Sequence, residues 1–195
     1  YDRRSFAEFL DLDLMLDKIP DETTILNFRH LLERNQLTKE LFKMIRKHLE
    51  KKGLIMKEGT IVDATIITAP SSTKNQDKER DSEMSSTCKN NSWHFGMKMH
   101  IGVDAKSGLV HTVESSTGKV SDREKFADLL HGEEKAVFGD KGYVNKVDKH
   151  YARDAGVFWG VLDKRGPGKD LSNRQKKRNI KLSKIRAKVE HPFRV

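Results

Sequence analysis

The segment GTIVDATIIT, residues 59–68, is rich in β-branched residues and apolar on both of its faces apart from Asp63. β-branched residues favour strands, and a strand that is buried on both faces reads as a nearly continuous apolar run. The segment therefore predicts a central strand of an α/β sheet. A carboxylate inside that strand is costly unless a cation or several hydrogen bonds compensate it, so Asp63 is a candidate functional residue.

The downstream segment WHFGMKMHIGVDAKSGLVHTVES, residues 93–115, alternates between apolar and polar residues. Its apolar side chains stand at positions 95, 97, 99, 101 and 103, and its polar face carries His94, Lys98 and His100. Alternation of this kind predicts a strand. Residues 104–108 predict a turn, and the residues from 109 onward predict the returning strand of a hairpin.

The rest of the chain alternates between predicted helices and strands. Residues 122–130 and 144–155 predict helices, as does the final segment, whose apolar stripe stands at positions 182, 185, 189 and 193. Residues 136–139 and 157–162 predict short strands, which should be parallel because helices connect them. This order predicts an α/β fold with a ribonuclease-H-like mixed sheet and flanking helices.

A small helical region is expected ahead of the sheet. Apolar residues recur there at helical spacing in two stretches, and Thr38 is the expected N-cap of the second. The two helices could form a helix-turn-helix reader of DNA or a packing subdomain, and the sequence leaves both open. We expect a helical N-terminal region at residues 1–58 and a catalytic domain at 59–195, with a mobile polar loop at 71–92.

The chain of 195 residues has a net charge of +9, and the positive charge is concentrated in one stretch. Residues 164–188 contain eleven Lys or Arg residues and a single acid, Asp170. Such an excess suits DNA, because neutralising phosphates releases counterions, although a solvated basic face is the alternative. No run approaches the ~18 apolar residues of a membrane span. The single cysteine, Cys88, excludes an internal disulfide and fits a reducing compartment.

Three carboxylates stand out by their predicted positions. Asp63 lies in the central strand, Asp140 follows the strand at 136–139, and Glu190 lies on the terminal helix four residues after Arg186. Open α/β sheets bind ligands at the carboxyl ends of their strands, and Mg²⁺ prefers oxygen ligands. Two such ions about 4 Å apart can activate an attacking oxygen and stabilise a leaving one. Taken singly, each carboxylate also fits a purely structural role: a cap at Asp63, a turn at Asp140, and an ion pair between Glu190 and Arg186.

Further residues are candidates for contacts with DNA. Lys98 and His100 lie on the polar face of the strand expected beside that of Asp63, where they either contact phosphate or face solvent. Trp93 either stacks on a base or anchors the neighbouring loop. The final helix supplies the other candidates, which are Arg174, Lys176, Lys177, Arg178, Lys181, Lys184 and Arg186.

Four strings carry a resemblance to a known family: GTIVDATIITAP, WHFGMKMHIGVDAKSGLVHTV, VFGDKGY and IRAKVEHPFRV. They resemble the transposases of bacterial insertion sequences, specifically insertion-sequence family five within the larger family-four-like group. The segments RRSFAEFL and PDETTILNFRHLL extend the resemblance towards the N-terminus. The resemblance implies that the catalytic D-D-E residues are Asp63, Asp140 and Glu190, at separations of 77 and 50 positions.

The third motif of this family has the form Tyr-x2-Arg-x3-Glu-x6-Lys. Arg186 and Glu190 match it, Ser183 stands in the place of the tyrosine, and the lysine would fall at position 197, beyond the printed sequence. The match is therefore complete for the carboxylate and the arginine only.

The resemblance implies a metal-dependent DNA transposase of the bacterial cytoplasm, with no membrane partner. Hydrolysis of a phosphodiester at the element end would release a 3′-hydroxyl, which would then attack a phosphodiester of target DNA. Mg²⁺ is the expected ion, with Mn²⁺ as a substitute. The expected partners are terminal repeats, target DNA and further copies of the chain in a synaptic complex. The alternative is a truncated or domesticated transposase that binds DNA without cutting it.

Overall fold

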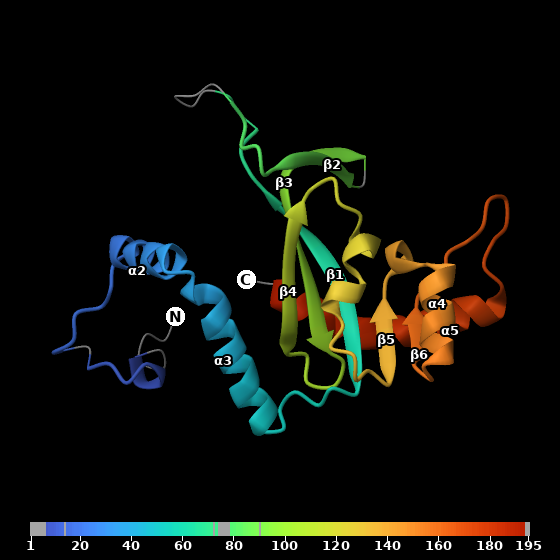
Figure 1. Ribbon diagram of the computed structural model, residues 1–195, viewed down its shortest axis with the longest axis horizontal. Coiled ribbons are helices and arrows are strands. Elements are labelled where there is room, and N and C mark those ends of the chain that lie inside the picture. Colours follow the sequence, from blue (N-terminus) through green and yellow to red (C-terminus); the bar gives the residue numbers. More distant parts are fainter. Residues whose placement is uncertain (1–6, 14, 72, 74–78, 90, 194–195) are drawn as a thin grey trace. The chain divides into compact units, whose positions relative to one another are not determined.

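The computed structural model describes residues 7–13, 15–71, 73, 79–89 and 91–193 of the chain. The chain divides into two compact units, Tyr1–His48 and Leu49–Val195. The first unit is helical, and the second contains a sheet with helices around it (Figure 1). A functional domain boundary after residue 58 stays a prediction.

Helices α2 (Glu22–Arg34) and α3 (Leu37–Lys51) precede the sheet, and they confirm the predicted helical region. Asp21 caps α2, because its carboxylate accepts a hydrogen bond from the Thr24 amide at 2.7 Å. The predicted cap at Thr38 is wrong, since α3 begins one residue before it. Neither helix contains a buried residue.

The second unit is built on a mixed sheet of six strands. They are β1 (Gly59–Thr68), β2 (Ser85–Lys89), β3 (Ser92–Asp104), β4 (Val110–Thr117), β5 (Ala136–Gly139) and β6 (Phe158–Val161). The strand order is β2-β3-β1-β5-β6, and β4 also pairs with β3. β3 is antiparallel to β1, β2 and β4, whereas β1, β5 and β6 are parallel to one another. The predicted central strand, hairpin and parallel strands are thus confirmed.

The interpretation of residues 71–92 as a single loop is wrong where strand β2 forms. Its sequence SSTCK pairs with the start of β3, and only Ser85 is buried. A strand with polar residues on both faces lacks the apolar alternation from which strands are predicted. Residues 72, 74–78 and 90 lie outside the described part of the chain, and the mobility of the segment stays a prediction.

Trp93 lies near the start of β3, opposite Cys88 of β2. Its side chain is 75 % exposed, which is too much for a residue that anchors a loop by packing. The anchoring interpretation of Trp93 is therefore wrong, and base stacking by it stays a prediction.

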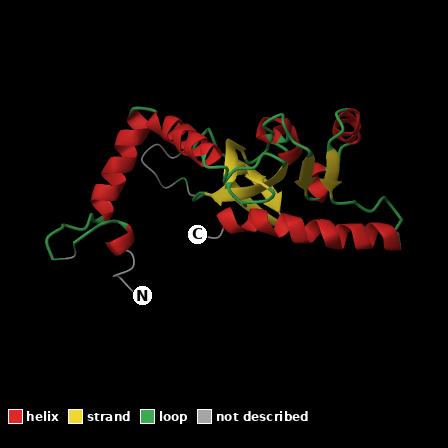
Figure 2. Cartoon of the chain, turned by 90° about the horizontal axis from the view of Figure 1, so that it is seen from below, coloured by secondary structure: helices red, strands yellow, loops and turns green. Residues whose placement is uncertain are grey.

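Helices and 3₁₀ turns cover the sheet. They are η1 (Asp122–Lys125), η2 (Ala127–Leu129), η3 (Lys141–Tyr143), α4 (Lys146–Asp154), α5 (Asn173–Arg186) and η4 (Ala187–Phe193). Two short 3₁₀ turns, η1 and η2, stand where the sequence predicts one helix. The long helix α5 runs along one face of the sheet (Figure 2).

The core has two parts, one on each face of the sheet. The first packs the sheet against α5 and η4 and contains Ile61, Ile101, Val103, Phe138, Leu162, Leu182 and Val189. The second packs the other face against η2 and η3 and contains Val62, Phe126, Leu129, Val137, Tyr143 and Val161. The predicted apolar stripe of the last helix is confirmed, since Ile185 and Phe193 also pack against the first part.

Asp104 ends β3 and is 1 % exposed. One carboxylate oxygen accepts hydrogen bonds from the Met56 and Lys57 amides, each at 3.0 Å. The other accepts bonds from the Lys106 amide at 3.0 Å and from the amide and hydroxyl of Ser107 at 2.7 and 3.0 Å. Asp104 therefore joins the β3–β4 turn to the segment that leads into β1.

Candidate active site

Asp63 and Asp140 occupy equivalent places on two neighbouring parallel strands. Ile61 of β1 pairs with Phe138 of β5; Asp63 stands two residues further along β1, and Asp140 stands two residues after Phe138, directly after β5 ends. Side chains two residues apart in a strand point to the same face, and neighbouring strands lie about 4.8 Å apart. The two carboxylates therefore lie side by side on the face that α5 covers, where β5 ends.

Asp63 is held by one cation and one amide. Its Oδ2 lies 3.1 Å from Arg186 Nη2, and its Oδ1 accepts a hydrogen bond from the Ala64 amide at 2.9 Å. Burial raises the pKa of Asp63 above its usual value and the charge of Asp140 adds to this, while Arg186 opposes the rise. The side chain keeps 22 % of its surface exposed, so a small cation can reach the carboxylate.

Asp140 is also the cap of a turn. Its Oδ1 accepts a hydrogen bond from the Gly142 amide at 2.7 Å, which starts the short turn η3. The turn alternative for Asp140 is thus confirmed. It does not exclude a ligand role, because in the described part of the chain Oδ2 accepts no hydrogen bond. Asp140 is therefore fixed in position by one oxygen and can offer the other.

Glu190 lies in η4, and its side chain is exposed. The sequence predicts one continuous helix through Glu190, but α5 ends at Arg186 and the chain continues as a 3₁₀ helix. A 3₁₀ helix has three residues per turn, so each residue is rotated by about 120° from the one before. Glu190, four residues after Arg186, is therefore rotated about 120° away from the face of Arg186. Among the described residues, no group of three or more His, Cys, Asp or Glu side chains is arranged to hold a metal ion.

Lys98 and His100 lie on the opposite face of the sheet from Asp63. Asp63 pairs with Ile101, so His100 points the other way. His100 is fully buried, with its Nε2 2.7 Å from Ser116 Oγ. Lys98 is 14 % exposed and lies 2.9 Å from Asp122 of η1. The predicted contact of these two residues with phosphate near the aspartates is therefore wrong.

Two cations of α5 point into the protein. Arg178 donates hydrogen bonds to the carbonyl oxygens of Val161 and Trp159, at 2.9 and 2.6 Å, and to Asp163 at 3.1 Å. Arg186 is occupied by Asp63. The prediction of Arg178 as a DNA contact is wrong, because its guanidinium fastens α5 to the end of β6.

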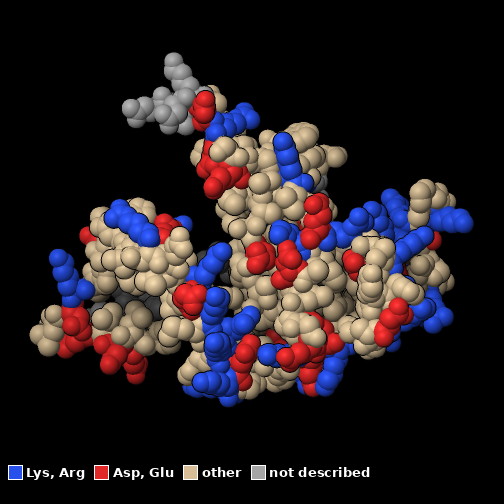
Figure 3. Space-filling view, viewed as in Figure 1, with Lys and Arg blue, Asp and Glu red and all other residues tan. Residues whose placement is uncertain are grey.

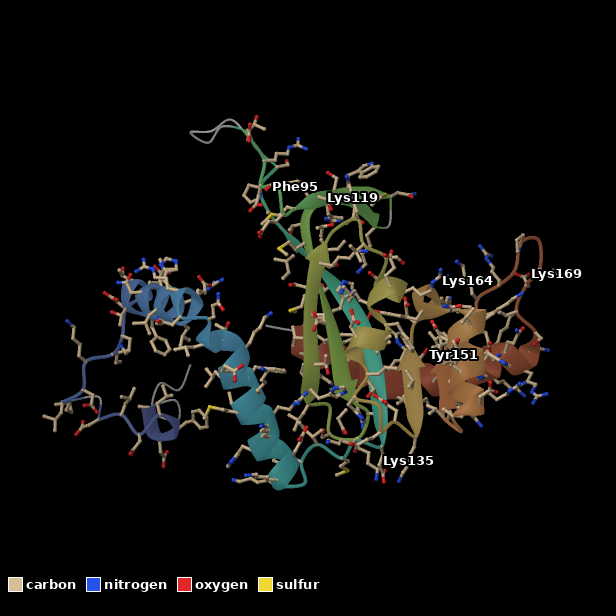
Figure 4. The ribbon with its side chains drawn as sticks, in the orientation of Figure 1. Phe95, Lys119, Lys135, Tyr151, Lys164 and Lys169 are labelled. Carbon is tan, nitrogen blue, oxygen red and sulfur yellow. The ribbon has the colours of Figure 1, made fainter. Side chains whose placement is uncertain are left out.

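Five predicted cations of α5 remain on the surface: Arg174, Lys176, Lys177, Lys181 and Lys184. None of them has an ion pair with another described residue. Lys and Arg also gather over the loop before α5 (Figure 3), where Lys164 and Lys169 project from the ribbon (Figure 4). This part of the second unit therefore presents a surface on which cations far outnumber acids, with Asp170 the one acid of residues 164–188.

The fold and the site define a mixed α/β domain with paired aspartates at one edge of its sheet and a basic helix on the same face. Residues 55–195, well over half of the chain, match the family model for the transposase DDE domain. The chain belongs to this family of DNA-recombining enzymes. No solved structure matches the chain significantly. None of its described helices has the length and apolar character needed to cross a bilayer.

Proposed function

We propose that the chain is a transposase of insertion-sequence family five, with a ribonuclease-H-like catalytic domain at residues 59–195. It would hydrolyse a phosphodiester at the element end and then join the released 3′-hydroxyl to target DNA. The observation that carries this proposal is the placement of Asp63 and Asp140 at equivalent positions of parallel strands. Family membership supports the transposase class, and the motif around Arg186 supports the finer assignment.

Asp63 and Asp140 fit a hard divalent cation, because both offer carboxylate oxygens on one face of the sheet. Mg²⁺ would be the natural ion, with Mn²⁺ as a substitute. A bound pair of such ions would supply charge stabilisation at the phosphoryl oxygens. Glu190 is proposed as the third carboxylate. It would join the site if η4 rewound as an α-helix, which would return Glu190 to the face of Arg186.

Arg186 has a defined part in this proposal. It neutralises Asp63 across the 3.1 Å contact, so that two neighbouring carboxylates can coexist before DNA binds. A guanidinium also matches the geometry of phosphate oxygens. Arg186 is thus placed to hold a phosphate once Asp63 is neutralised by another cation.

A cleavage assay tests the proposed function. The substrate is a labelled duplex that carries the DNA flanking the coding sequence, incubated with the full chain and Mg²⁺. We expect a nick that leaves a 3′-hydroxyl, followed by its covalent joining to unlabelled plasmid. A protein that binds the duplex in Mg²⁺ and Mn²⁺ but never nicks it would contradict the proposal. That result would favour a non-catalytic DNA-binding role, which the lack of a three-carboxylate group among the described residues also supports.

The basic surface makes a separate prediction about salt. Replacing Lys176, Lys177 and Lys181 by Ala should make the slope of log K against log salt shallower by up to about three units, because each neutralised phosphate contributes about 0.9. The change should be similar for specific and random DNA, since phosphate contacts do not read sequence. Fluorescence anisotropy over a salt series measures it.

Arg178→Met is the matched control, because Arg178 belongs to the same run but faces inward. It should leave the salt slope unchanged and lower the free energy of unfolding by about 2 kcal/mol. A triple variant with the parental slope would show that the run is only a solvated face.

A further inference from the structure

A pocket of about 290 Å³ lies beside Asp140 and outside the aspartate pair. It is lined by Lys141, Lys164, Arg165, Asp170, Leu171 and Lys176. Four of these six residues are cations, and one is an acid. The pocket contains no aromatic residue and no histidine, so it suits neither a stacked base nor a soft metal ion.

The topology explains why these cations meet. Lys141 directly follows Asp140 at the end of β5, and Lys164 and Arg165 follow the end of β6. The two strands are parallel and adjacent, so their carboxyl ends lie at one edge of the sheet. Lys176, in the first turn of α5, closes the pocket. The pocket therefore continues the edge that carries Asp140, on the side of β6.

The four cations of this pocket outnumber its one acid, Asp170. No ion pair or side-chain hydrogen bond joins Lys141, Lys164, Arg165 or Lys176 to another described residue. Elsewhere in the domain, Lys98, Lys125 and Arg186 each have a carboxylate within 3.1 Å. Four converging cations against one carboxylate favour an anion with several acceptor oxygens.

We propose that this pocket binds a backbone phosphate of DNA next to the phosphodiester that reacts at Asp63 and Asp140. This rests on the proposed function, and it adds Lys141, Lys164 and Arg165 as positioning residues. A phosphate is favoured over an acidic peptide because the pocket adjoins Asp140, where the DNA backbone must pass for cleavage. Leu171 provides an apolar contact for the neighbouring sugar. The DNA strand then runs from the aspartates towards β6.

A charge-deletion scan of the DNA tests this inference. Single methylphosphonates, which are uncharged, are placed at each phosphate around the cut in the flanking duplex. Binding is measured without divalent metal, so the result does not depend on cleavage. Neutralising one phosphate contributes about an eightfold gain in affinity between 1 M and 0.1 M salt. One methylphosphonate position should therefore weaken binding by the parent about eightfold at 0.1 M salt.

The variant Lys164→Ala/Arg165→Ala should lose affinity by a similar factor for unmodified DNA. At the position that the pocket contacts, the methylphosphonate should cause no further loss, while at all other positions the losses should add. Lys146→Ala/Lys149→Ala on α4 is the control, since both lysines are exposed and line a different pocket. In this control variant, the methylphosphonate at the contacted position should still weaken binding about eightfold.

Two outcomes would overturn the inference: parental affinity in Lys164→Ala/Arg165→Ala, or additive losses at every methylphosphonate position. Because the four side chains are exposed, the variants should fold, and Lys164→Gln/Arg165→Gln repeats the test with longer side chains. If the losses add at every position while cleavage stays intact, the pocket alone is rejected. If the losses fail to add at one position but no DNA is cleaved, the pocket is supported and the proposed catalysis is rejected.

Discussion

Asp63→Asn is expected to lower Mg²⁺-dependent cleavage of DNA by roughly a thousandfold or more, a loss of about 4 kcal/mol of transition-state stabilisation. The amide keeps the shape of the side chain and can still accept the hydrogen bond from Ala64. It removes the charge that would hold the metal and that repels phosphate when no metal is bound. DNA affinity should therefore stay the same or rise, which anisotropy measures beside the cleavage assay.

The stability of Asp63→Asn separates a catalytic effect from a folding effect. Burial raises the pKa of Asp63, so the native state already disfavours the charged form, and the neutral amide should fold about as well as the parent. Asp128→Asn is the matched control, because Asp128 is half exposed and its ion pair among the described residues is with Lys125. It should retain full cleavage. Parental cleavage by Asp63→Asn would remove Asp63 from the mechanism.

Asp104→Ala is expected to cause the largest loss of stability, about 4 kcal/mol. The substitution leaves the amides of Met56, Lys57, Lys106 and Ser107 without their acceptor in a partly buried place. A loss of this size corresponds to a decrease of roughly 10 °C in the melting temperature of a domain of this length. Urea unfolding followed by circular dichroism measures it, and a change below about 1 kcal/mol would contradict this account of the turn.

The pH dependence of stability provides a second readout for Asp104. Burial favours the neutral acid, but hydrogen bonds from Ser107, Lys57 and Met56 outweigh it and hold the pKa of Asp104 below 3.8. A carboxyl with a lowered native pKa stabilises the fold above its unfolded pKa, and this contribution is lost as the pH falls. The parent should therefore lose stability below about pH 4, and Asp104→Asn should lose less over the same interval.

The strands were predictable where apolar residues keep a regular period. The alternation in β3 and the unbroken apolar run in β1 identify both strands, and the core confirms which face is buried. β2 has no such alternation, because an edge strand with exposed polar residues needs none. His100 and Lys98 are polar residues of a strand that are nevertheless covered by other elements. The polar face of β3 suggests exposure, but η1 and η2 cover it, which follows from tertiary packing and not from the local pattern.

Part of the candidate site was also predictable from the sequence. Asp63 and Asp140 stand out in the sequence because each accompanies an apolar strand. Arg178 stands four residues before Leu182 and seven before Ile185, so helical spacing already places it on the apolar stripe, but only the structure shows that its guanidinium bonds to the end of β6. Glu190 differs from expectation because α5 ends at Arg186 and the chain continues as the 3₁₀ helix η4, a change that the apolar period of the sequence does not reveal.

During catalysis, the side chain of Asp63 is expected to touch a divalent cation. Exchange of this ligand tests it most directly: Asp63→Cys is assayed for cleavage at about pH 8.5, where much of the thiol is ionised. Mg²⁺ demands oxygen ligands, whereas Mn²⁺ tolerates sulfur better. If Asp63 touches the cation, Asp63→Cys should not cleave DNA in Mg²⁺ but should partly recover cleavage in Mn²⁺, and Asp63→Asn should be inactive in both. Equal activity of Asp63→Cys in the two metals, or no recovery in Mn²⁺, would contradict it.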